Sequence, residues 1–499
     1  MRIFLVFLLG ILPVVAQAEP RFEPRPLPVE HIYQGGWEHF VGGGVAVLDC
    51  NGDGFDDVFV AGGVGLARLL VNQTTGAGAD IAFSVGAFEV ITGVTGAYPL
   101  DIDSDGHLDL AVLRVGANVL LKGGPDCTFA DASDLWGFDG DDRWSTAFSA
   151  TWEAGRDWPT LAFGNYVDRS DPDGPFEACD VNEVHRHDGK TYVAQDLAPG
   201  YCALSMLFSD WNRDGTQDLR VSNDRHYYVR GGSEQMWSMP DLVLETGAGW
   251  EPISIWGMGI ASQDLTGDGR PEVVLTSMGD QLMQIASANG YEAAPFEIGT
   301  YAQRPHTGGD GRPSTGWHAE FGDVDNDGHV DLFIAKGNVD QMPGMAMQDP
   351  NNLLMQRPDG SFVERGLEAG VATMARSRGA ALHDLNRDGL LDLLVVNRRA
   401  GLELYQNATR DVGHWLAVDL SQTGSNPDAI GAWVEVKLEG RVLTQELTVG
   451  GGHVSGALGA LHFGLGTAEE VELRVIWPGG EPEPWRTYGA NQIIGVSRF

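Results

Sequence analysis

A nine-residue phrase recurs six times along the chain, and it carries the side chains that bind hard cations. The first copy runs from Asp49 to Asp57 and reads D-C-N-G-D-G-F-D-D. Oxygen-bearing side chains stand at places one, three and five, Gly at place six and a carboxylate at place nine. This spacing lets a loop turn sharply around an ion such as Ca²⁺. The other copies begin at Asp101, Asp210, Asp264, Asp323 and Asp384.

The expected ligands are the side chains at places one, three, five and nine and the backbone carbonyl at place seven. The residue type at place seven varies, which fits a backbone ligand. We therefore predict up to six bound Ca²⁺; the alternative is that the Asp and Asn side chains only form turns. The fourth loop is the least regular, with Thr266 at place three and Glu272 at place nine. Loop by loop, the candidate ligands are Asp49, Asn51, Asp53, Phe55, Asp57; Asp101, Asp103, Asp105, His107, Asp109; Asp210, Asn212, Asp214, Thr216, Asp218; Asp264, Thr266, Asp268, Arg270, Glu272; Asp323, Asp325, Asp327, His329, Asp331; Asp384, Asn386, Asp388, Leu390, Asp392.

The residues after each loop exclude the helix–loop–helix calcium motif, which needs a bidentate Glu at place twelve. Place twelve is apolar in all six copies: Val60, Val112, Val221, Leu275, Ile334 and Val395. Each loop is followed by a short apolar run bounded by Gly and Asp, and residues 41–48 form a similar run before the first loop. Such runs are strand signals. Each loop is therefore expected to join two strands.

The spacing of the loops predicts seven repeating units. The step from the second phrase, at Asp101, to the third, at Asp210, is about twice as long as any other step between successive phrases. A seventh unit is expected in this gap, at residues 146–166, with its second strand at residues 161–164. Places one, three, five and nine then fall on Trp152, Ala154, Arg156 and Thr160, and none of them is a carboxylate. We expect this unit to fold like the others and to bind no metal.

Seven units of about 50–60 residues, each with several short strands, predict an all-β, seven-bladed β-propeller. Stacking the small sheets in a ring covers their faces and leaves only short edges. The ring needs a closing strand, which we expect from residues 31–40. An open solenoid and rings of six or eight blades are the alternatives. The propeller is expected to span residues 19–410.

The pattern changes near Asp411, after which the loop phrase does not recur. Residues 415–420 alternate as an antiparallel strand does, and residues 433–436 and 471–477 are similar apolar runs. We expect residues 411–499 to form a separate small β-sandwich.

The charge balance excludes one class of partner. Lys and Arg total 32 against 70 Asp and Glu, which gives a formal net charge of −38. Phosphate repels such a surface, so we expect no nucleic-acid partner.

Residues 1–18 have the pattern of a signal peptide. Arg2 precedes an apolar run at residues 3–15, and residues 16–18 (A-Q-A) form a cleavage site of small residues. Later in the chain no stretch reaches the roughly 18 apolar residues that a membrane span needs. We expect cleavage near Ala18 and a secreted, periplasmic or extracellular protein; an uncleaved anchor is the alternative.

Four cysteines remain in the exported chain, at positions 50, 127, 179 and 202. They include no C-x-x-C element, so a zinc site is not expected. Three disulfide pairings are possible. We expect Cys179 with Cys202, with Cys50 and Cys127 as the residual pair; free thiols are the alternative.

The repeated phrases resemble the FG-GAP/VCBS repeats of integrin α-subunit-type propellers. The C-terminal region resembles the ASPIC/UnbV domain, through residues 425–432 (S-N-P-D-A-I-G-A), 450–453 (G-G-G-H), 461–466 (L-H-F-G-L-G) and 477–480 (W-P-G-G). This layout is that of the cartilage acidic protein family and its bacterial relatives. The resemblance implies an exported, calcium-loaded propeller with an adhesive or binding role, and it names no ligand. The EGF-like module that usually follows in this family is absent, which argues against an animal matrix role.

The favoured function is an adhesion or macromolecule-binding module whose partner is an unidentified protein or glycan at one propeller face. The alternatives are a polysaccharide lyase or hydrolase with a site at the central channel, and a scaffold for envelope assembly. No catalytic residue is predicted: His185, His187, His226, His306 and His318 are interpreted as packed or surface polar groups, and the tryptophans as packing within and between blades. The methionines at 342, 345 and 347 are expected to pack on a propeller face rather than to hold a soft metal.

Overall fold

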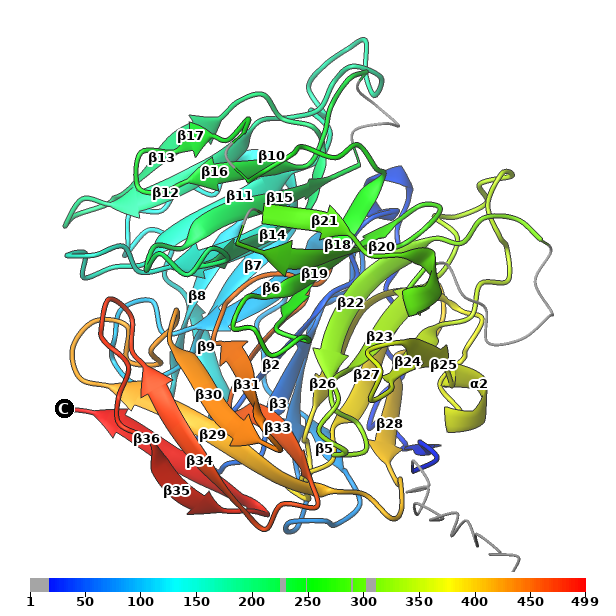
Figure 1. The fold of residues 1–499 in the computed structure, drawn as a ribbon. Helices are drawn as coiled ribbons and strands as arrows, with labels where there is room; N and C mark the ends of the chain where they lie inside the picture. Colours follow the sequence, from blue (N-terminus) through cyan, green and yellow to red (C-terminus); the bar gives the residue numbers. More distant parts are fainter. Residues whose placement is uncertain (1–17, 225–229, 248, 289, 302–310) are drawn as a thin grey trace, which may run out of the picture.

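The computed structural model describes residues 18–499 other than 225–229, 248, 289 and 302–310 (Figure 1). The signal-peptide prediction therefore lies outside the described residues, apart from Ala18, as do the predictions for His226 and His306. The described chain is almost entirely β, with one α-helix, α2 (Gly366–Ala369), and the 3-10 turns η1 (Trp37–His39), η2 (Pro125–Cys127) and η3 (Phe296–Ile298). None of its helices has the length and apolar character needed to cross a membrane.

The strands before residue 411 form seven four-stranded antiparallel units in the described part of the chain. In order they are β2 (Val45–Leu48), β3 (Asp57–Val60), β4 (Arg68–Asn72), β5 (Phe83–Val85); β6 (Val94–Leu100), β7 (Asp109–Ala117), β8 (Val119–Gly124), β9 (Thr128–Asp131); β10 (Asp142–Thr151), β11 (Thr160–Asn165), β12 (Asn182–His187), β13 (Tyr192–Leu197); β14 (Ala203–Ser209), β15 (Asp218–Asn223), β16 (Gln235–Ser238), β17 (Val243–Leu244); β18 (Gly257–Gln263), β19 (Glu272–Ser277), β20 (Leu282–Ser287), β21 (Gly290–Ala293); β22 (Gly316–Gly322), β23 (Asp331–Lys336), β24 (Asn352–Gln356), β25 (Phe362–Glu364); and β26 (Arg376–His383), β27 (Asp392–Arg398), β28 (Glu403–Asn407), β1 (Phe22–Pro24).

The units are arranged in a ring. Each first strand contacts the first strand of the next unit, and β26 of the last unit contacts β2 of the first. The second and third units also share one sheet, because β10 pairs with β7. The all-β propeller class expected from the repeats is confirmed. Each loop phrase joins the first and second strands of a unit, as expected.

The ring is closed by β1, which pairs with β28 through Phe22 opposite Asn407. The prediction that residues 31–40 supply this strand is wrong. Phe22 is buried in the core of the last unit, whereas Ile32, Tyr33 and Gln34 make only isolated bridges to the last and first units. After them, Gly35 at φ +150° and Gly36 lead into η1, so no longer strand forms.

The first strand of the first unit is also shorter than predicted. It begins at Val45, after Gly42 and Gly43, whose φ values of +100° and +94° lie far from those of regular strands.

The C-terminal region folds as a small sandwich of two sheets. One sheet holds β29 (His414–Gln422), β33 (Leu461–Gly466) and β36 (Gln492–Arg498). The other holds β30 (Trp433–Leu438), β31 (Arg441–Glu446), β34 (Glu470–Ile476) and β35 (Arg486–Gly489). The expected strands at 415–420, 433–436 and 471–477 lie within β29, β30 and, except for Trp477, β34.

The sandwich is not independent of the ring, because residues 449–458 leave it and enter the centre of the propeller. Their last three residues form β32 (Gly456–Leu458), which pairs in parallel with β2. The residues before β32 bridge to the first strands of four further units, at Ala150, Leu207, Ile260 and Ala97. We call residues 449–458 the channel segment.

The close approach of the channel segment explains two glycines in the ring. A Cβ added to Gly44 or to Gly96 would lie 1.7 or 2.1 Å from the carbonyl oxygen of Val454. Any side chain at either position would displace the segment.

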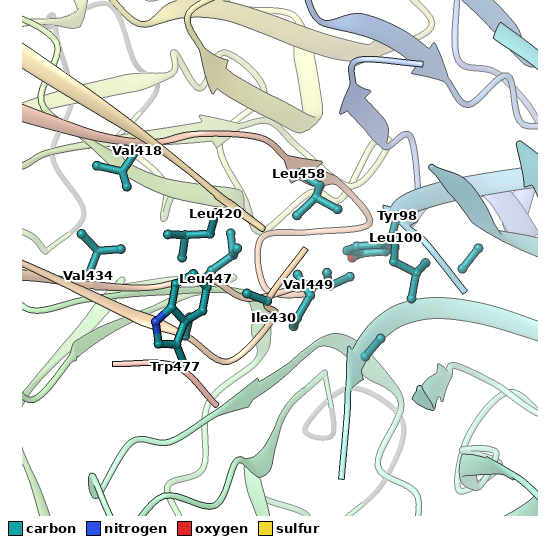
Figure 2. Close-up of a cluster of buried hydrophobic side chains, with 14 of the residues drawn as sticks. Tyr98, Leu100, Val418, Leu420, Ile430, Val434, Leu447, Val449, Leu458 and Trp477 are labelled. Carbon is teal, nitrogen blue, oxygen red and sulfur yellow. The ribbon is translucent and has the colours of Figure 1, made fainter. Parts of the chain in front are cut away.

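One hydrophobic core continues from the second and third units into the sandwich. Figure 2 shows Tyr98 and Leu100 of the second unit beside Val449, with Leu447 and Trp477 further into the sandwich. Burial of this apolar surface is the main force that holds the sandwich on the ring.

Both expected disulfides are formed, Cys50–Cys127 and Cys179–Cys202. Cys50 lies at place two of the first loop and Cys127 in the second unit, so this bond joins two neighbouring units on the side of the loops.

Candidate metal centres

The six loops share two internal hydrogen bonds: the place-one carboxylate accepts the place-six N–H, and the place-five carboxylate accepts the place-seven N–H. In the first loop, the Asp49 carboxylate accepts the N–H groups of Asp53 and Gly54, and the Asp53 carboxylate accepts the N–H of Phe55. The place-six glycines have φ values of 84–88° in every loop, a conformation that L side chains rarely adopt. The sequence phrase therefore specifies one loop geometry at all six positions.

The place-nine carboxylate has a role that the sequence did not reveal. In the fifth loop, Asp331 accepts the N–H of Val324 at place two and the N–H of Gln356 on the third strand. The first, second, fourth and sixth loops repeat this arrangement of backbone donors, and in the third loop the indole N–H of Trp211 replaces the place-two donor. This carboxylate ties the start of its loop to the third strand of the unit, whether or not it also contacts a metal.

Two loops bring carboxylates close enough to share an ion. Oxygens of Asp101, Asp103 and Asp109 lie within 4.8 Å of one another, and so do those of Asp323, Asp325 and Asp331. These are places one, three and nine, as predicted. Oxygens of Asp103 (Oδ1) and Asp325 (Oδ2) are buried without a hydrogen-bond partner, which is costly unless a cation is close. The residues of these loops fit a hard cation.

A third group of potential ligands, Cys50, Asp57 and Cys127, is not a metal centre. Its two sulfur atoms form a disulfide and cannot act as thiolate ligands.

Electrostatics also favour a cation in the loops. Burial, aided by the neighbouring carboxylates, raises the pKa of Asp109 to about 8 and that of Asp325 to about 7. The pKa values of Asp323 and Asp331 are also raised well above the usual carboxyl value, for the same reasons. A divalent ion would keep these carboxylates ionised by compensating their charges.

A lysine side chain from a neighbouring strand reaches the carboxylates of the second loop. Lys122, on β8, donates to the carboxylates of Asp103 and Asp105 at places three and five. A metal ion at this loop would therefore compete with an ammonium group for the same oxygens.

The loop of the third unit replaces the carboxylates with an ion pair. Thr160 begins β11, the strand position expected for place nine, and its hydroxyl donates to Glu153 at 2.5 Å. Arg186 donates to the same carboxylate at 2.6 Å. The guanidinium group of Arg186 thus supplies a positive charge beside Glu153 in this unit.

The chain matches two family models. Residues 49–112, 264–334 and 323–395 match the FG-GAP-like repeat, and residues 422–498 match the domain described as ASPIC and UnbV. The protein is an FG-GAP repeat protein with a C-terminal ASPIC/UnbV domain. The matched repeats contain five of the six loops; the third, at Asp210, lies outside them.

No curated protein matches the chain. Similar solved structures include BBS1N in complex with ARL6DN, soaked with mercury, at 10% identity and a TM-score of 0.46, covering 77% of this chain and 96% of that one. Another is an Agrocybe aegerita lectin described as recognising non-reducing terminal N-acetylglucosamine, at 15% identity and a TM-score of 0.35, covering 66% of this chain and 80% of that one.

The ASPIC/UnbV domain lies against the FG-GAP loops. Its Glu446 accepts the N–H of Asp210 and the side chains of Ser209 and Gln217 at the third loop. Arg213 of that loop lies 4.0 Å above the ring of Trp433.

The ASPIC/UnbV domain also contacts the fourth and sixth loops. Gln263, next to the fourth loop, donates to the carbonyl of Thr444, and His462 contacts the carbonyl of Gly389 in the sixth loop. The domain therefore covers the side of the propeller on which the loops lie.

The histidines at the centre of the ring are packed polar groups, as expected for His318. The Nδ1 atom of His318 accepts the N–H of His453, and its Nε2 atom lies 3.1 Å from the Glu320 carboxylate. His185 is also buried, and His187 stacks on Trp158.

Two of the three methionines are packed as predicted, whereas Met347 is 38% exposed. Met342 and Met345 lie in a cluster with Trp144 and Trp317 that fills the ring from the side of the connections between second and third strands.

Proposed function

We propose that this FG-GAP protein is an exported, calcium-loaded propeller that binds a macromolecule, a protein or a glycan, with the face opposite its loops. The observation that carries the proposal is the loop geometry, which repeats six times and leaves buried carboxylate oxygens unpaired in the second and fifth loops. Up to six Ca²⁺ would be held by the predicted residues at places one, three, five and nine and by the place-seven carbonyl. The ions are structural in this proposal.

The binding face follows from the direction of the strands. The second strand of each unit runs away from its loop, so the connection to the third strand reaches the opposite face. Two of these connections are long, residues 166–181 and 337–351. Because the ASPIC/UnbV domain covers the loop side, this opposite face is the one left for a large partner.

A binding role is favoured over the polysaccharide enzyme because of the channel. An enzyme of this architecture would hold its catalytic groups in the central channel, where the channel segment lies here. The His318–Glu320 pair is packed against that segment.

Export is supported by the two disulfides, which persist in oxidising compartments. It also agrees with the signal-peptide pattern at the start of the chain.

A glycan array and a pull-down of exported proteins, both in millimolar Ca²⁺, test the proposal. Capture is expected to fall when Phe176 of the 166–181 connection is replaced (Phe176→Ala) and when calcium is chelated. The matched control is Phe499→Ala, which removes a fully exposed ring from the ASPIC/UnbV domain. Loss of capture with Phe499→Ala but not with Phe176→Ala would place the partner on the ASPIC/UnbV domain and contradict the proposed binding face. Turnover of a glycan without stable binding would favour the enzyme.

A further inference from the structure

The ASPIC/UnbV domain closes the fifth FG-GAP loop directly. The N–H of Gly413 donates to the carbonyl of Asp325 at 2.9 Å, and the N–H of Gly466 donates to the carbonyl of Asn326 at 2.8 Å. Arg441 of β31 donates to the carbonyl of Gly328. Three backbone carbonyls of one loop are thus bonded to three separate segments of the domain.

The approach is too close for a side chain on the domain. An ideal Cβ on Gly464 would lie 1.9 Å from an oxygen of the Asp323 carboxylate, which is far inside van der Waals contact. The backbone of β33 therefore lies directly over the place-one ligand of this loop.

Place three holds a carboxylate in the second and fifth loops, and it is more deeply buried in the fifth: Asp103 is half-buried, whereas Asp325 is buried. Asp323, Asp325 and Asp331 are only 4%, 1% and 1% exposed. The place-five carboxylate is half-buried in the fifth loop (Asp327) and in the sixth (Asp388), and exposed in the first four: Asp53, Asp105, Asp214 and Asp268. In the fifth loop an oxygen of Asp325 is buried and has no hydrogen-bond partner.

We propose that the fifth loop is a shared site, in which Ca²⁺ binding and docking of the ASPIC/UnbV domain stabilise each other. The inference rests on the proposed calcium loading. Without an ion, nothing compensates the charges of Asp323, Asp325 and Asp331, so each carboxylate that stays ionised is repelled by its neighbours and the loop loosens. The carbonyls that hold Gly413 and Gly466 then lose their fixed positions.

The coupling is reciprocal: the free energy by which Ca²⁺ binding favours docking equals the free energy by which docking favours Ca²⁺ binding. Docking holds the loop in its ion-binding shape, so undocking is expected to release the ion from the fifth loop. The first four loops keep their ions, because their place-five carboxylates already face solvent.

The first experiment compares two place-three variants, Asp325→Ala in the fifth loop and Asp103→Ala in the second. Each is expected to lose about one Ca²⁺ per chain by elemental analysis. Hydrogen exchange followed by mass spectrometry then reports on residues 411–415 and 461–466. Asp325→Ala is expected to speed exchange there by roughly 5- to 150-fold, the usual size of a coupling, and Asp103→Ala to leave it unchanged.

The second experiment tests the reverse direction by the release of ⁴⁵Ca into excess unlabelled Ca²⁺. One ion per wild-type chain is expected to leave more slowly than the rest. Arg441→Ala should remove this slow phase. Lys437→Ala is the matched control, because Lys437 pairs with Glu472 and lies over the ring of Trp485, both within the sandwich.

The outcomes separate the two claims. Loss of an ion in Asp325→Ala with unchanged exchange at residues 411–415 and 461–466 would overturn the coupling and leave the calcium proposal standing. Equal effects of the two place-three variants, or a slow phase that survives Arg441→Ala, would also overturn it. A wild-type chain that holds no Ca²⁺ would overturn both.

Discussion

The channel segment is expected to loosen in acid because of one buried histidine, His453. The hydrogen bonds define its neutral form: Nδ1 donates to the carbonyl of Leu204 at 3.1 Å, and Nε2 accepts the N–H of Gly42 at 3.3 Å. A second proton on Nε2 would face that N–H. Burial, together with the positive charge of Arg378 and with His318, lowers the pKa of His453 to about 3.

The sign and size of the effect follow from this pKa. The unfolded histidine has a pKa of about 6.5, so between pH 6.5 and pH 3 the unfolded state binds more protons than the folded state. Stability is therefore lost as the pH falls through this window. At pH 5 the loss amounts to about 1.5 pK units at 1.36 kcal/mol each, or about 2 kcal/mol.

The assay is hydrogen exchange of residues 449–456 at pH 7 and pH 5, corrected for the intrinsic exchange rates and run in saturating Ca²⁺. Protection in the wild type is expected to fall roughly 30-fold between the two values, which corresponds to about 2 kcal/mol. His453→Gln keeps a donor and an acceptor but does not titrate, so its protection should change much less. An equal fall in both proteins would refute the assignment to His453.

Three further predictions address the metal centres and the shared core. Chelation by EDTA is expected to lower the melting temperature by several degrees or more, because each site contributes about 2.7 kcal/mol when Ca²⁺ is present at about 100 times its Kd; an unchanged melt would refute structural calcium. Asp101→Ala or Asp323→Ala should each lose about one Ca²⁺ per chain by elemental analysis, while Thr160→Ala should lose none; an ion lost with Thr160→Ala would mean that the third unit also binds metal. Leu458→Ala in the channel segment and Leu473→Ala in the sandwich should each lower the free energy of unfolding by ~2–5 kcal/mol in one common urea transition, because both side chains are buried in the same core; two separate transitions would contradict a shared core.

The loops and their strands could be predicted because their information is local. An apolar residue at place twelve, such as Val112, and a Gly with positive φ at place six, such as Gly106, describe the turn and the strand after it within one short stretch of chain. The same rhythm placed Thr160 at the start of a strand although that loop has lost its carboxylates.

The errors and omissions concern contacts between distant parts of the chain. The closing strand is Phe22–Pro24 and not residues 31–40, because the choice depends on which apolar side chain fits the last unit, at the other end of the propeller sequence. The second backbone donor to the place-nine carboxylate comes from the third strand, and no spacing within the phrase indicates it.

The channel segment joins the sandwich to the ring, and its sequence gives no sign of this contact. Residues 450–453 (G-G-G-H) have no strand periodicity, and β32 is a very short strand that pairs in parallel with β2, near the start of the chain. The segment fits because the ring has glycines opposite it: Gly44 and Gly96 leave room for the carbonyl of Val454. Because the same domain enters the channel and covers the loops, the proposed calcium sites and the proposed partner lie on opposite faces. Calcium is then expected to affect partner binding through the stability of the ring, and not by contact with the partner.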